Sequence, residues 1–87
     1  MLPLYIEVKA HAPTDTKGKR VSAKIKGKGR RYYPWDYQHD AAVNMRAAAY
    51  EYAQGILNRM GFAFDDPVLT EVRSDNTGLP IGYVWEG

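Results

Sequence analysis

The sequence contains no cysteine among its 87 residues. Disulfide scaffolds and thiolate metal sites are therefore excluded, although small secreted domains often depend on such cross-links. Long apolar runs are missing too, because Glu7 and Lys9 interrupt the apolar start of the chain. We therefore expect neither a signal peptide nor a membrane span, and we predict a protein of the reducing cytoplasm without a membrane partner.

Acidic residues are missing from one stretch of the chain. Between Lys17 and Arg31 there are eight basic residues and no acidic one. Since the net charge of the whole protein is only +2, the remainder of the chain contributes −6. Positive charge is thus concentrated in one segment, which points to a polyanionic or an acidic partner.

Composition and length predict one small globular domain over residues 1–87. The chain is 45% hydrophobic and 25% charged, which is typical of a folded protein. Seven Tyr and two Trp are many for this length, and large rings let a short chain bury area from few positions.

Alternation of apolar and polar residues predicts strands over residues 4–10, 20–26 and 30–33. In the first strand Tyr5, Glu7 and Lys9 share one face. Gly27-Lys28-Gly29 is typical of a tight hairpin turn between the second and third strands. His11 follows the first strand, and we expect it alone in a surface loop.

A helix is predicted from about residue 40 to residue 60, because apolar residues recur at spacings of three and four. Asp36 or Asp40 is suited to cap its start, Gly61 to follow its end, and Asn44 is expected on its polar side. Further strands are predicted over 68–73 and 81–85, joined by a turn at 74–78. The fold class is α+β: an antiparallel sheet in the order β-β-β-α-β-β, packed on one long helix.

The segment Pro13-Thr14-Asp15-Thr16-Lys17-Gly18-Lys19-Arg20 resembles a motif of short phage- and plasmid-encoded proteins, Pro-Thr-Asn/Asp-Thr-Arg/Lys-Gly-x-Arg. In that group a basic strand, an Ala-rich helix and a C-terminal hairpin follow the motif. The resemblance implies an origin in a phage or related mobile element, and hence the cytoplasm of a bacterial host. It implies no mechanism and supplies no catalytic residues.

The basic hairpin is the strongest functional signal. Alternate strand residues lie about 7 Å apart, near the phosphate spacing of nucleic acid. Cations interleaved with rings are what a strand-based nucleic-acid surface uses. The predicted nucleic-acid-binding residues are Arg20, Lys24, Lys26, Lys28, Arg30, Arg31, Tyr5, Tyr32 and Tyr33. A solvated edge kept soluble by lysines, or contact with an acidic protein, are alternative interpretations.

Other patterns are weak. Asp36, His39 and Asp40 do not form a recognised metal signature, and a helix cap is the simpler interpretation. No nucleophile and base stand at a catalytic spacing, so we expect no enzyme, metal or cofactor. The aromatic run over residues 32–37 is expected to supply at least two core rings, and the others are either core or recognition surface.

The predicted function is that of a small phage or mobile-element accessory protein that contacts nucleic acid through its basic hairpin face. The alternative is a phage-encoded inhibitor of a host defence system, resembling anti-CRISPR proteins, that docks on a protein which itself binds nucleic acid. A homodimer is also possible if the first strand or the C-terminal strand is a free edge that pairs across a two-fold axis.

Overall fold

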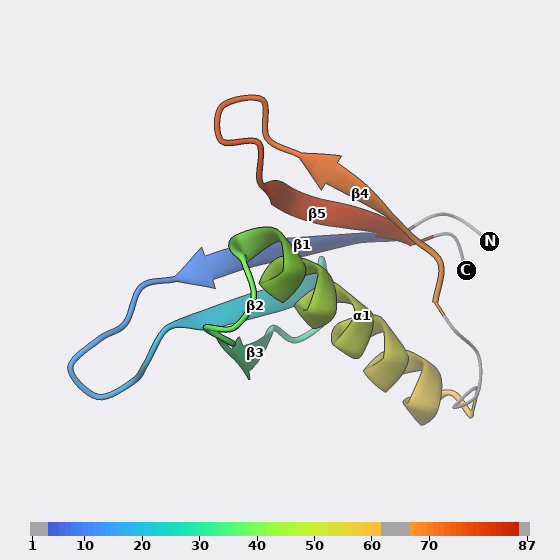
Figure 1. Cartoon of the computed structure of the whole chain (residues 1–87). Helices are drawn as coiled ribbons and strands as arrows, with labels where there is room; N and C mark the ends of the chain where they lie inside the picture. Colours follow the sequence, from blue (N-terminus) through green and yellow to red (C-terminus); the bar gives the residue numbers. More distant parts are fainter. Residues whose placement is uncertain (1–3, 62–66, 86–87) are drawn as a thin grey trace.

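Five antiparallel strands and one helix make up the fold in a computed structural model, which describes residues 4–61 and 67–85 (Figure 1). The elements follow along the chain as β1 (Leu4–His11), β2 (Arg20–Ile25), β3 (Arg31–Pro34), α1 (Ala41–Arg59), β4 (Leu69–Arg73) and β5 (Pro80–Trp85). The strands lie in the order β3-β2-β1-β5-β4. The predicted α+β class and the order β-β-β-α-β-β are therefore confirmed.

The edges of the sheet are β3 and β4, which differs from our expectation. The central strand β1 pairs with β2 on one side and with β5 on the other, and β5 also pairs with β4. The pairing of β1 with β5 joins the two ends of the chain, and local sequence patterns do not report contacts of such separation. The prediction that the first or the C-terminal strand is a free edge was therefore wrong.

Helix α1 crosses one face of the sheet and contacts β1, β2, β3 and β5 (Figure 1). Register places Ile6 opposite Ile25 and Val8 opposite Ala23, so these side chains point together toward the helix. The helix meets them largely through alanines such as Ala49 and Ala53, whose small side chains let helix and sheet approach closely. The core thus lies in one layer between α1 and the sheet.

The start of α1 is fixed by two polar side chains. Asp40 caps it, since its Oδ1 accepts a hydrogen bond of 2.9 Å from the Val43 amide. Asn44 is only 5% exposed, so its predicted place on the polar side was wrong. Its amide binds the preceding loop instead, where it accepts from the Asp36 amide and donates to three carbonyl oxygens.

The helix ends at Arg59, one residue before the predicted end, and Gly61 adopts the positive φ of 89° that suits a glycine after a helix. Among the described residues, no helix combines the length and the apolarity that crossing a bilayer requires.

Candidate functional site

Strands β1, β2 and β3 present a face that no described element covers, here called the open face (Figure 1). Every second side chain of each strand reaches this face, and residues that are paired across strands lie on the same face. Register pairs Glu7 with Lys24, Lys9 with Ser22, and Ser22 with Tyr32. The open face comprises Tyr5, Glu7, Lys9, His11, Arg20, Ser22, Lys24, Arg30 and Tyr32.

Most cations of the open face have no acidic partner. Glu7 is its one acid, and its Oε1 lies 3.8 Å from an Arg30 guanidinium nitrogen in a solvent-exposed pair. Such pairs contribute little stability. Lys9, Arg20 and Lys24 form no ion pair with any residue in the described part of the chain. The face therefore keeps an excess of positive charge that is available to an anion.

A compact cluster of polar and aromatic side chains lies on the open face where the end of β1 meets β2 and β3. The Tyr32 ring, 49% exposed, has the Arg20 guanidinium 4.9 Å and the His11 ring 5.3 Å from its centroid. His11 Nε2 lies 2.7 Å from the Ser22 hydroxyl oxygen. His11 ends β1 and was wrongly expected alone in a loop. Because Ser22 is only 2% exposed beneath the cluster, its hydroxyl is closed to a substrate.

The charges around His11 affect its protonation. Burial lowers its pKa, and the positive charges of Arg20, Lys9 and Arg30 lower it further. The ring is therefore held neutral at neutral pH. It positions Tyr32 and Ser22 and does not add to the positive charge of the open face.

Tyr5 also lies on the open face, but its ring is already in use. The ring covers Gly82 of β5, where a Cβ atom would collide with the Tyr5 side chain. Tyr5 is 43% exposed, and burial, followed by the negative charge of Glu7, raises its pKa. Both rings of the open face thus contact other residues, Tyr5 covering Gly82 and Tyr32 lying against Arg20 and His11.

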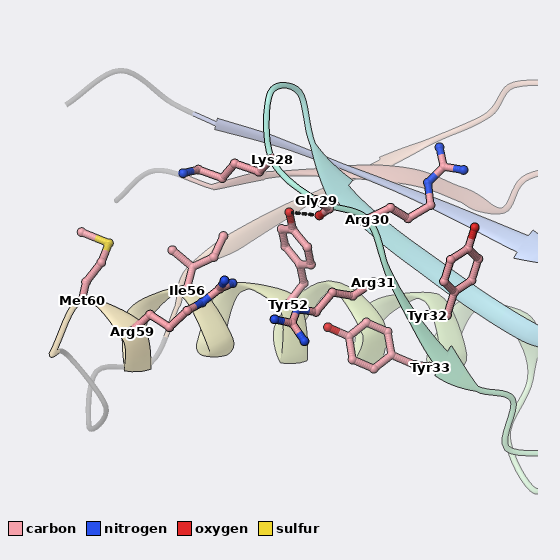
Figure 2. A pocket seen from close by; sticks show the side chains of 10 residues that line it. All are labelled: Lys28, Gly29, Arg30, Arg31, Tyr32, Tyr33, Tyr52, Ile56, Arg59 and Met60. Carbon is pink, nitrogen blue, oxygen red and sulfur yellow. Dashed lines mark hydrogen bonds between the residues drawn. The ribbon is translucent and has the colours of Figure 1, made fainter.

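The remaining predicted residues lie elsewhere. Lys26 and Lys28 are exposed in the β2–β3 hairpin. Arg31 pairs with Ala23, and Tyr33 with Val21, so both lie on the helix side of the sheet. Figure 2 shows Arg30 and Tyr32 on one side of the chain and Arg31 and Tyr33 on the other. The predicted nucleic-acid-binding residues therefore do not all share one face of the sheet.

A groove of about 690 Å³ lies between β3 and the C-terminal half of α1 and is here called the β3–α1 groove. It is lined by Lys28, Gly29, Arg30, Arg31, Tyr32, Tyr33, Tyr52, Ile56, Arg59 and Met60 (Figure 2). One wall is fixed by Tyr52, whose hydroxyl donates a hydrogen bond of 2.7 Å to the Gly29 carbonyl oxygen and accepts one from the Ile25 amide. This contact ties the hairpin to the helix.

Two residues with positive charge were missed by the sequence interpretation. Lys9 reaches the open face through the same alternation that places Glu7 there, so the strand pattern already contained this signal. Arg59 enters the β3–α1 groove only because the last turns of the helix pass β3. No pattern in the sequence reports that contact.

Metal ligation finds no support within residues 4–61 and 67–85, where no three His, Asp or Glu side chains gather around a common point. Asp36 Oδ2 and His39 Nε2 lie 3.6 Å apart at the surface, while Asp40 is engaged as the helix cap.

Comparisons of the protein with models of known families, with curated proteins and with solved structures find no match.

Proposed function

We propose that this protein binds nucleic acid through its open face and the β2–β3 hairpin. It acts as a small accessory protein of a phage or related mobile element, in the cytoplasm of the bacterial host. In this role the Tyr32 ring stacks on a nucleobase, and Tyr5 packs beside the interface. Phosphates are neutralised by six side chains: Lys9, Arg20, Lys24, Lys26, Lys28 and Arg30.

The observation that carries this proposal is the unpaired charge on an uncovered face. Lys9, Arg20 and Lys24 have no acidic partner among the described residues, although the rest of the chain is acidic. Neighbouring cations repel one another, so the cluster lowers stability unless an anion occupies it. A half-exposed ring that Arg20 and His11 already hold in place loses little freedom when a base stacks on it.

Fluorescence anisotropy with labelled DNA and RNA oligonucleotides, single- and double-stranded, tests the proposal. If six phosphate contacts form on duplex DNA, the logarithm of affinity falls with the logarithm of salt concentration at a slope of about −5. The double variant Lys9→Gln/Lys24→Gln should weaken binding and reduce that slope by about 1.8. Arg46→Gln removes an exposed charge from α1 and serves as the matched control.

Absence of binding to every oligonucleotide at low salt would refute the proposal. An acidic protein surface would meet the same cations, as the alternative of a defence inhibitor requires. A pull-down from nuclease-treated host lysate separates the two. A specific protein that Lys9→Gln/Lys24→Gln no longer retains would favour the inhibitor.

A further inference from the structure

The basic surface does not stop at the edge of the sheet. Arg30 lies on the open face, where it meets Glu7, whereas the next residue, Arg31, lies on the helix side opposite Ala23. Figure 2 shows the two guanidinium groups on opposite sides of the chain. Within the described residues β3 has no strand on its outer side, so this edge of the sheet is exposed. Because Arg30 and Arg31 lie on its two sides, positive charge continues around the edge.

Beyond that edge lies the β3–α1 groove. Lys28, Arg31 and Arg59 line it, and none of the three has a carboxylate within ion-pair distance in residues 4–61 and 67–85. Arg59 donates from Nε to the Gly55 carbonyl oxygen at 3.3 Å, which anchors its side chain to the helix. Glu51 is the acid of the adjoining hollow, beside Tyr33. The groove is therefore basic overall and suited to an anion.

The groove also offers aromatic surface. The Tyr33 ring is partly buried against the core, and burial, followed by the negative charge of Glu51, raises its pKa, so the hydroxyl stays neutral. Tyr32 and Tyr33 thus place one ring on each side of β3, next to Arg30 and Arg31. A volume of about 690 Å³ falls within the range of about 300–1,000 Å³ typical of pockets for small ligands.

We infer that a single-stranded nucleic acid crosses the β3 edge, running from the open face into the β3–α1 groove. This inference rests on the proposed nucleic-acid binding and narrows its ligand class. Duplex DNA has a persistence length of about 150 base pairs, so bending it around an edge of a protein only 39 × 30 × 26 Å in extent costs deformation energy that a flexible single strand does not. A single strand bends at each nucleotide and stacks its bases on rings along the way.

The test compares a labelled 15-nucleotide single strand with a 15-base-pair duplex at the same salt concentration. The wild-type protein should prefer the single strand. The groove variant Arg31→Gln/Arg59→Gln should weaken single-strand binding about tenfold and lower its salt slope by about 1.4, while duplex affinity changes less than about twofold. The variant Lys9→Gln/Lys24→Gln should weaken both ligands, and Arg46→Gln neither. Circular dichroism checks that each variant is folded. The single variant Arg59→Gln repeats the comparison of single strand and duplex with a substitution at an exposed helix position, where the fold should not be disturbed.

The outcomes separate the inference from the function on which it rests. If the wild-type protein binds neither ligand, the proposed function fails. If it binds but the groove variants leave single-strand affinity unchanged, or weaken both ligands equally, only the inference is overturned.

Discussion

His11 is the residue whose ionisation is most closely tied to the fold of the open face. It contacts Ser22 and Tyr32, and the positive charges of Arg20, Lys9 and Arg30 act on its ring. Burial is the largest cause of its lowered pKa, and these positive charges add to it. The folded protein therefore disfavours the imidazolium form.

This environment predicts a loss of stability in mild acid. The unfolded chain binds a proton at His11 near the ordinary pKa of about 6.5, while the folded protein resists it until lower pH. The free energy of unfolding should therefore be highest above about pH 6.5. It should fall as the pH drops below that value and through the lowered pKa that His11 has in the folded protein. Urea denaturation between pH 7.5 and 5.5 measures this slope, above the range in which most carboxylates titrate.

His11→Gln should flatten the slope, because glutamine does not titrate and still offers a hydrogen bond to Ser22. His39→Gln is the control, since His39 is an exposed residue before α1 and its loss should leave the slope intact. A slope that persists in His11→Gln would contradict this assignment.

Asn44 shows why a single polar residue can be misjudged from sequence. A helical wheel places it away from the apolar stripe, and an asparagine there is normally solvated. In the fold, its four hydrogen bonds hold the loop from Asp36 to Asp40 against the first turn of the helix. Which backbone groups a loop leaves unpaired depends on its path, and periodicity carries no information about that path.

At the scale of elements, Tyr5 and Gly82 join β1 to β5. The Tyr5 ring lies over the glycine on the open face, in a cross-strand contact that needs the missing side chain. Glycine within a strand otherwise weakens it, since it has no side chain to pack. The ring therefore compensates for the glycine.

This pairing predicts coupling between two substitutions. Gly82→Ala should be neutral or slightly destabilising in the wild-type protein, because the flexible Tyr5 side chain must move aside. In a Tyr5→Ala background the same change should stabilise by about 0.5–1 kcal/mol, since the collision is gone and alanine is the better strand residue. Chemical denaturation of all four proteins in this double-mutant cycle gives the coupling energy.

Additive effects of the two substitutions would show that the ring does not lie over Gly82. Ala10→Gly in β1 is a useful comparison, because it introduces a strand glycine away from the contact of Tyr5 with Gly82 and should destabilise in both backgrounds.

The bounds of the strands and the helix could be predicted from local patterns. The face of the sheet that each side chain of β3 takes could not. Alternation and the caps of α1 bounded each strand and the helix to within a residue or two. In β3, however, Arg30-Arg31 and Tyr32-Tyr33 are tandem pairs, so shifting the register by one residue exchanges identical side chains between the two faces. Only the pairing with β2 decides that Arg30 and Tyr32 take the open face.

At the scale of the whole molecule, the order of the strands determines which surfaces are available. The sequence indicated a basic hairpin, but it did not indicate that β5 lies beside β1 and leaves β3 at an edge. That arrangement divides the basic segment between the open face and the β3–α1 groove. Long-range pairing thus distributes one basic segment of the sequence over two neighbouring surfaces.

The same arrangement bears on self-association. The exposed edges are β3, which is four residues long and ends at Pro34, and β4, whose register shifts between Val72 and Arg73. Proline lacks the amide hydrogen that a new strand would need, and charged side chains and irregular register also discourage pairing between edges. These features oppose the continuous sheet that a two-fold dimer would form.

We therefore predict a monomer with the mass of one chain, 9.9 kDa, in light scattering coupled to size-exclusion chromatography. Removing two of the barriers, in Arg31→Thr/Pro34→Val, should produce self-association that grows with protein concentration. Pro13→Ala changes a proline in an exposed loop and should remain monomeric. A wild-type mass of two chains would contradict the prediction.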